Sequence, residues 1–349
     1  MVRINFRASL KTILCFFSLS LLSAETRKDT KKRIVSQEKP LLINNSDVAK
    51  TSLEEIVLEA DGKLDKSGKK LYQYKAHIKK LEINANQEAL GKEISLSGTI
   101  NQINLSATIS SIFIRSYFNA NETYYLFDAT QSQITFAGII IASQSIIADT
   151  GTKVIFLHQC TGSYDSKNEM FGILQFYTSQ PIIIKNMSLY SSNLQITNEK
   201  VQIDIAQIIL NQEQGKAKKI LAKIDDFIIS IEEMNMRSKI NLQSKFINKI
   251  IAKNIKCLRK SDKTEISSGL AEFENDKLTL PQAISIKTKN FTLTAANGYQ
   301  EGKKIFLKKI NFKTKNANGF SQSGYFDIKH KKLILENGKI EWQSSQAKI

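Results

Sequence analysis

The stretch ISIKTKNFTLTA, residues 284–295, decides the fold class of this chain. Its apolar side chains recur at every second position, first at Ile284 and Ile286 and then at Phe291 and Leu293. Successive side chains of a β-strand point to opposite faces, so this alternation predicts two strands with one packed face and one solvated face. The β-branched Ile and Thr residues of the stretch also favour a pleated sheet.

The same alternation recurs from Ser52 onward, which predicts an all-β protein. Gly, Asn and Asp, which favour turns, separate the apolar runs. Asn-Gly in particular is favoured where both central residues of a type I′ hairpin turn take positive φ. Tight turns are therefore predicted at Asn297-Gly298, Asn318-Gly319 and Asn337-Gly338, and further turns at Asp61-Gly62, Ser67-Gly68 and Thr150-Gly151.

A weak internal repeat combines a turn, two lysines and an apolar strand. Its clearest copies are GKKLY at residues 68–72 and GKKIF at residues 302–306, and related stretches begin at Gly215 and Lys331. Such repetition predicts a stack of similar hairpins whose core runs along the stack.

Residues 246–258 depart from this pattern. Their apolar side chains, such as Phe246, Ile250 and Leu258, follow helical spacing, and the lysines at 245, 249, 253 and 256 recur at steps of four, four and three. This favours an amphipathic helix that covers an open end of the sheet. Ile251 and Ile255 also fit a strand, which is the alternative.

The N-terminus has the order of a secretory signal. Basic residues precede the uncharged run ILCFFSLSLL, residues 13–22, and the small residues Ser23-Ala24 follow it. The run is shorter than the ~20 residues that span a bilayer, so we expect cleavage near Ala24. Retention as an N-terminal anchor is the alternative. The expected organisation is a signal peptide in 1–24, a linker in 25–51, β modules in 52–195 and 196–343, and a tail in 344–349.

The formal net charge is +17, and the lysines are spread along the whole chain rather than gathered in one patch. That spread fits an AT-rich coding sequence as well as selection for charge. An exported basic protein meets lipid headgroups and polysaccharide phosphates more readily than nucleic acid, so no nucleic-acid partner is expected.

The sequence offers little for catalysis. It has no P-loop, no G-x-S-x-G and no G-x-G-x-x-G. His158 and Cys160 are too sparse for a zinc site, and Cys160 and Cys257 are expected to stay free rather than pair. Asp225-Asp226 and Glu232-Glu233 would point to opposite faces of a strand rather than across a cleft. We therefore expect no enzyme, no cofactor and no metal.

Aromatic residues cluster around residues 119–121, where they could stack on sugars or bases, although ordinary strand packing is the simpler interpretation. They are Tyr117, Phe118, Tyr124, Tyr125 and Phe127.

The last quarter of the chain resembles a known family. LTLPQ at residues 278–282 precedes the alternating stretch, and KKIF at 303–306, NGFSQSGYFD at 318–327 and KLILENGKI at 332–340 follow it. This succession resembles the OstA-like family of lipopolysaccharide transport proteins, which includes LptA and LptC. Residues 134–149 and 201–231 show a similar succession of stretches.

The resemblance implies a β-jellyroll, β-taco-like slot of stacked antiparallel strands that holds acyl chains, with at most one or two short helices. It implies a groove lined by Ile284, Ile286, Phe291 and Leu293. The implied partners are lipopolysaccharide or another amphipathic lipid, and other β-jellyroll transport proteins joined through sheet edges. The implied location is the periplasm, with peripheral or N-terminally anchored membrane association.

Two other classes stay open. An exported β-solenoid adhesin predicts a filled core and exposed aromatic patches. A carbohydrate-active enzyme predicts a polar cleft with converging carboxylates.

Overall fold

The computed structural model describes residues 33–35, 51–61, 72–84, 88–100, 103–119, 122–136, 139–165, 172–185, 188–211, 214–238, 247–274 and 277–342. The chain forms two compact units that divide at Asn198 and Glu199, and residues 209–212 group with the first. The expected signal peptide and tail lie outside the described residues, as does most of the expected linker.

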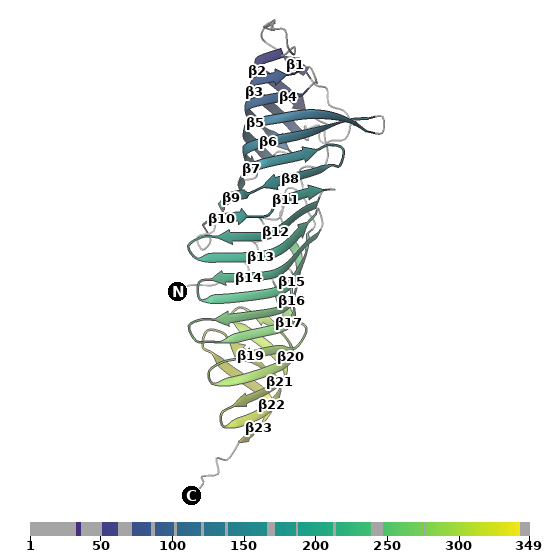
Figure 1. Ribbon diagram of the computed structural model, residues 1–349. Coiled ribbons are helices and arrows are strands. Elements are labelled where there is room, and N and C mark those ends of the chain that lie inside the picture. Colours follow the sequence, from purple (N-terminus) through teal and green to yellow (C-terminus); the bar gives the residue numbers. More distant parts are fainter. Residues whose placement is uncertain are drawn as a thin grey trace. The chain divides into compact units, whose positions relative to one another are not determined.

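The N-terminal unit is built from strands that lie side by side (Figure 1). Strands β2 to β7 pair antiparallel in chain order, and β7 then pairs with both β8 and β9. Strand β12 in turn pairs with β10 and β11. The strands are β1 Arg33–Val35, β2 Thr51–Asp61, β3 Tyr72–Ile83, β4 Ala89–Ile100, β5 Ile103–Asn119, β6 Glu122–Phe136, β7 Ile139–Asp149, β8 Val154–His158, β9 Cys160–Asp165, β10 Ile173–Thr178, β11 Ile182–Lys185 and β12 Ser188–Thr197.

The C-terminal unit repeats this plan. Strands β14 to β17 pair antiparallel in order, the short β18 and β19 each pair with both β17 and β20, and β20 to β23 again pair in order. The strands are β13 Val201–Leu210, β14 Gln214–Ile224, β15 Phe227–Ser238, β16 Ile247–Arg259, β17 Glu265–Glu274, β18 Lys277–Leu280, β19 Ile284–Lys287, β20 Phe291–Glu301, β21 Lys304–Thr314, β22 Ala317–Asp327 and β23 Lys332–Trp342.

No helix occurs in the part of the chain that the structure describes, so the all-β class predicted from the sequence is confirmed. The helix expected over 246–258 is wrong, because β16 lies there between β15 and β17. Both of its edges are paired, and Ile250 and Ala252 are buried while Lys249 and Lys253 form ion pairs with glutamates. Lysine steps of four keep one face of a strand as well as one side of a helix, which explains the ambiguity.

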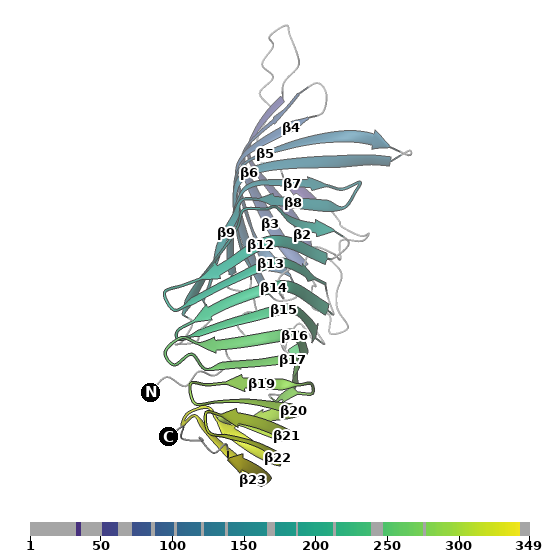
Figure 2. The same ribbon diagram turned by 60° about the horizontal axis from the view of Figure 1, so that its bottom comes forward.

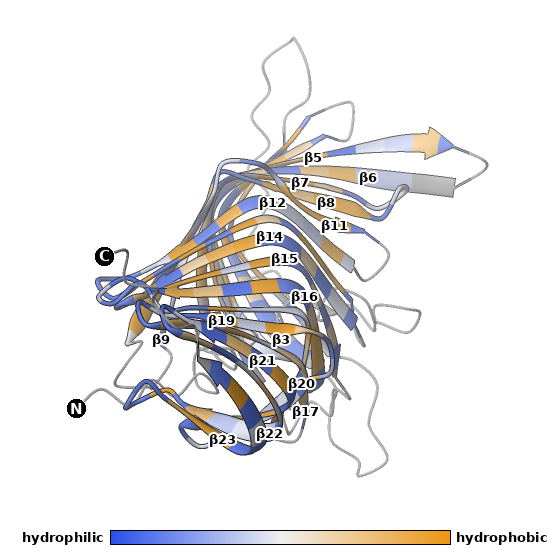
Figure 3. Ribbon diagram, turned by 90° about the horizontal axis from the view of Figure 1, so that it is seen from below, coloured by the Kyte–Doolittle hydropathy of each residue, from blue (hydrophilic) through white to orange (hydrophobic). Residues whose placement is uncertain are grey.

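Apolar and polar residues alternate along the strands, as the hydropathy colouring in Figure 3 shows. On β14, for example, Ala217 and Ala222 are buried, whereas Lys216 and Lys223 are exposed. We call the buried side of each sheet its inner face and the other side its outer face.

Most of the long strands bend at one position, where the register of paired residues skips one residue of the strand. Between the pairs Glu54↔Lys80 and Ile56↔Ile78, for example, Glu55 takes φ +53°. On about every second strand, a residue at the same kind of bend also has positive φ. These residues are Glu93, Gln131, Asn193, Lys219, Asn254, Lys309 and Asn337. A left-handed residue breaks the extended path, so each strand turns there and the sheet folds toward its inner face.

Buried hydroxyls occupy the inner side of these bends. Ser143 Oγ donates to the carbonyls of Ser145 and His158 at 2.8 and 2.9 Å. Thr178 and Ser321 make the same pair of contacts, one to the carbonyl two residues further along the chain and one to a carbonyl of the neighbouring strand. Each hydroxyl therefore links its own strand segment to the neighbouring strand beside the bend.

The three predicted Asn-Gly turns are wrong. Residues 297–298, 318–319 and 337–338 all lie inside strands β20, β22 and β23. A Cβ on Gly298 would lie 2.3 Å from the Phe306 carbonyl oxygen, so glycine is needed there for close strand approach rather than for a turn. Asn337 takes φ +57° at a bend, a conformation that Asn tolerates.

The chain instead turns at residues 302–303, 315–316 and 328–331. The first of these precedes Lys304, and the third precedes Lys332, so the turn-and-lysine pattern of the repeat is confirmed at both places. The turn predicted at Thr150-Gly151 is also confirmed, and its backbone bonds to Tyr125. The Gly62, Ser67 and Gly68 positions lie outside the described residues.

Candidate functional site

An apolar row runs along the inner face of the N-terminal unit from β3 to β7. Cross-strand pairs such as Ile78↔Ile94, Ile114↔Phe127 and Ile134↔Ile141 place its members side by side. We call this row the N-terminal apolar face; its residues are Ile78, Ile94, Ile109, Ile112, Ile114, Phe127, Ile134, Ile141 and Ile146.

Most of this face is only half-buried. Ile94 and the neighbouring Ala129 are buried near the bends, at 8% and 4% exposure, but Ile109, Ile112 and Ile114 keep part of their surface in solvent. Half-buried aliphatic side chains on the concave side of a sheet present contiguous apolar surface to whatever enters. The face thus keeps part of its apolar surface in contact with solvent.

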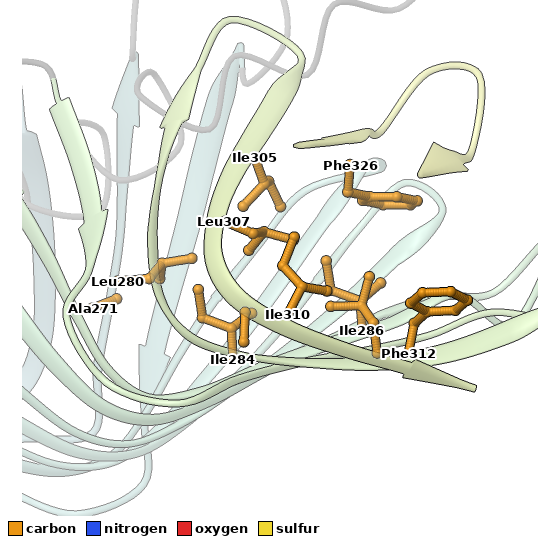
Figure 4. Close-up of a cluster of buried hydrophobic side chains, with 11 residues drawn as sticks. Ala271, Leu280, Ile284, Ile286, Ile305, Leu307, Ile310, Phe312 and Phe326 are labelled. Atoms are coloured by element: carbon orange, nitrogen blue, oxygen red, sulfur yellow. The ribbon is translucent and has the colours of Figure 1, made fainter. Parts of the chain in front are cut away.

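The inner face of the C-terminal unit is packed instead. Ile284, Ile286 and Leu293 are 1%, 0% and 1% exposed and belong to one hydrophobic cluster, which Figure 4 shows. Phe291 is half-buried at the cluster's margin, with its ring edge-on to Phe326 at 6.0 Å between centroids. The four residues proposed from the sequence as groove residues therefore share one inner face, but they contact one another there.

A small cavity lies beside this cluster. It measures about 20 Å³ and lies beside Cys257, Ile266 and Phe326. Such a volume holds about one water molecule, so an acyl chain could enter only if the packed side chains separated. The role of Ile284, Ile286, Phe291 and Leu293 in a groove stays a prediction.

The residues considered for catalysis do not form a site. Cys160 packs with Leu157 and Ile182, and burial raises the pKa of its thiol to about 11, which keeps it protonated. The His158 ring stacks on Phe156 instead, at 6.3 Å. Cys160 and Cys257 are both free thiols.

The paired carboxylates have structural partners. Asp226 accepts hydrogen bonds from Ser261, the largest cause that lowers its pKa, and from Arg259 Nε at 3.0 Å. Glu232 bonds to the Asn254 amide, and Glu233 lies 3.3 Å from Lys253. Each side chain is oriented toward a neighbouring strand or turn rather than toward a shared cleft.

Two groups of aromatic side chains lie on the surface. One is at the end of the β5–β6 hairpin, where Phe118 is 70% exposed and Tyr125 46%. The other crosses the outer face of the C-terminal unit, where Tyr299, Phe306 and Tyr325 are direct cross-strand partners. Tyr299 and Phe306 stack at 5.0 Å and 12°, and Lys304 lies 4.3 Å from the Tyr325 ring centroid.

The sequence pattern missed the feature that distinguishes the two units. Alternation gives the same inner row in both, because period-two spacing reports which face a side chain is on and not what covers it. The second group of aromatics could have been found from its spacing, since Tyr299 and Phe306 flank the turn at Gly302 symmetrically.

Comparison of the chain with known protein families, with curated proteins and with solved structures gave no match. No helix with the length and apolarity needed to cross a bilayer was found in the described ranges. Among those same residues, no three His, Cys, Asp or Glu side chains gather in a way that could hold a metal ion.

Proposed function

We propose that this protein carries an amphipathic lipid in the periplasm, as a component of lipopolysaccharide transport or of a related outer-membrane lipid pathway. In this proposal it binds acyl chains on the N-terminal apolar face and needs no catalytic residue, cofactor or metal. Neighbouring β-jellyroll proteins would join it through sheet edges, and the N-terminal segment would direct export or serve as an inner-membrane anchor.

The observation that carries the proposal is the half-buried N-terminal apolar face. Each methylene transferred from water to such a surface gains ~0.8 kcal/mol, so an acyl chain gains affinity from simple burial along the row. Ile284 and Ile286 are fully packed, so the C-terminal cluster offers no comparable surface. The excess of lysine would favour phosphorylated headgroups over neutral ones.

Site-specific photo-crosslinking in intact envelopes tests the proposal. A photoreactive phenylalanine at Ile112 or Ile114 is expected to capture lipopolysaccharide or another acylated lipid. Matched positions are Thr108, which is exposed on the outer face of the same strand, and Ile286, which is packed in the C-terminal cluster. Lipid adducts at Ile112 and Ile114 with none at Thr108 would support a carrier, whereas no adduct at either isoleucine in a normally expressed protein would overturn it.

A second candidate function is that of an exported adhesin. The filled C-terminal core and the stacked Tyr299, Phe306 and Tyr325 favour it, because a flat row of aromatic rings on a solvated face can stack on sugar rings. Changing Tyr299 to Ala should then weaken binding to a polysaccharide column without affecting lipid capture at Ile112. Equal retention of wild type and variant would remove this candidate.

A further inference from the structure

The β5–β6 hairpin extends beyond the strands on either side of it. The two strands pair as far as Asn119↔Glu122, but β4 follows β5 only to Ile114 and β7 follows β6 only to Leu126. We call residues 115–119 and 122–125 the hairpin tip. Figure 2 shows this part of β5 and β6 projecting past its neighbours.

The hairpin tip continues the N-terminal apolar face. Along β5, residues Ile112, Ile114, Ser116 and Phe118 lie on one face because successive side chains alternate. Ile114 is opposite Phe127, and Ser116 is opposite Tyr125. The half-buried row therefore leads outward, through Tyr125, to Phe118 at 70% exposure.

The base of the hairpin tip is held by the turn after β7. Tyr117 donates a hydrogen bond of 2.7 Å to Asp149, and the Tyr125 amide donates to Thr150 Oγ1 at 2.8 Å. The rings of Tyr117 and Tyr124 lie 5.6 Å apart. An isolated two-stranded ribbon is only marginally stable in water, so these contacts hold the exposed rings in a fixed direction.

The chemistry of the hairpin tip fits the surface of a lipid bilayer. Phe118 offers an apolar ring without a polar atom, and Tyr117 and Tyr125 have the amphipathic rings that favour the headgroup region. Arg115 is exposed on the same ribbon and supplies a cation for phosphate groups.

We propose that the hairpin tip docks in the headgroup region of a lipid bilayer and passes an acyl chain along Phe118 and Tyr125 onto the N-terminal apolar face. This inference rests on the proposed function. It adds to that function a contact between the hairpin tip and a membrane, and the direction from which the acyl chain reaches the N-terminal apolar face.

Vesicle binding by the mature chain tests the docking step. The probe is a set of vesicles of phosphatidylcholine and phosphatidylglycerol at a ratio of about three to one, measured by co-sedimentation. Phe118→Ser combined with Tyr125→Ser is expected to weaken the partition into vesicles about ten-fold or more, because two exposed rings no longer leave water. Tyr190→Ser, at an exposed tyrosine of β12, is the matched control and should bind as the wild type does.

A second measurement separates docking from lipid carriage. Binding of a fluorescent fatty acid in solution without vesicles reports on the N-terminal apolar face. Phe118→Ser alone, which leaves Tyr125 and its contact with Phe127 in place, should retain this binding together with an unchanged far-ultraviolet circular dichroism spectrum. Vesicle binding undiminished in the tip variant would overturn the docking inference and leave the carrier function standing. Wild-type protein that binds vesicles through the tip but no fatty acid would overturn the carrier function instead, and with it the transfer of an acyl chain.

Discussion

Lys331 and Asp262 form an ion pair between turns whose strands do not pair with each other. Lys331 Nζ, just before β23, lies 2.7 Å from Asp262 Oδ2, in the turn between β16 and β17. Arg259 Nη1 also approaches Asp262, at 3.5 Å. These contacts surround the small cavity next to Phe326, so they join the β22–β23 turn to the rest of the C-terminal unit.

The Asp262 ion pair predicts a loss of stability in acid. Burial acts to raise the pKa of Asp262, but Lys331 and the Thr264 hydrogen bonds outweigh it and lower the pKa from 3.8 to about 2. A carboxylate with a lowered pKa in the folded state stabilises it above about pH 4, and this contribution disappears as the pH falls toward 2.

Asp262→Asn is therefore expected to reduce the free energy of unfolding by about 1 kcal/mol at pH 7, after allowing for solvent screening, and by almost nothing at pH 2. Urea denaturation at both pH values measures this difference. Glu301→Gln, at an exposed carboxylate, is the control and should have little effect at either pH. An equal cost for Asp262→Asn at both pH values would contradict the assignment.

Removal of a bend hydroxyl should destabilise the C-terminal unit. Ser321 is fully buried and its Oγ bonds to the carbonyls of Ser323 and Glu336, so Ser321→Ala removes the hydroxyl that links these two carbonyls. We expect a cost of about 1–3 kcal/mol in the free energy of unfolding. Ser323→Ala removes only a 3.1 Å contact with the exposed Glu336 carboxylate and should cost less than about 1 kcal/mol by the same measurement.

Glycine should be tolerated at a bend and not beside it. Lys309 takes φ +52°, which strains a non-glycine residue by about 1–2 kcal/mol, so Lys309→Gly relieves that strain while adding flexibility to the unfolded chain. We expect a net change near zero or slightly stabilising. Lys308→Gly, one residue earlier and in the paired ladder, should cost about 0.5–1 kcal/mol. Thermal unfolding of both variants tests this order, and a larger loss for Lys309→Gly would contradict it.

Equal truncations on the two inner faces should have unequal effects. Ile286→Ala opens a cavity in a packed cluster and should lower the free energy of unfolding by about 2–5 kcal/mol. Ile112→Ala removes a half-buried side chain and should cost roughly 1 kcal/mol, while weakening fatty-acid binding. Equal losses of stability would show that the N-terminal face is packed as tightly as the C-terminal one.

The fold class followed from local pattern, whereas the Asn-Gly pairs were assigned wrongly to turns. Alternation at Ile284 and Ile286 reports strand and face directly, because both depend on neighbours two residues away. The Asn-Gly pairs were misassigned because the same two residues suit a hairpin turn, a strand bend as at Asn337, and a close strand approach as at Gly298. Only the register of the adjacent strand separates these cases.

In the candidate site, too, local sequence pattern set some features and tertiary structure set the others. The sequence by itself determined that the chain would form stacked strands with an apolar inner row and a polar outer row, since period-two spacing is a local property of the backbone. Tertiary structure alone decided that Ile286 is enclosed and Ile112 is not, because enclosure depends on side chains that distant strands bring across the bend. It also decided that Phe118 stays exposed, since strands β4 and β7 end before they reach it.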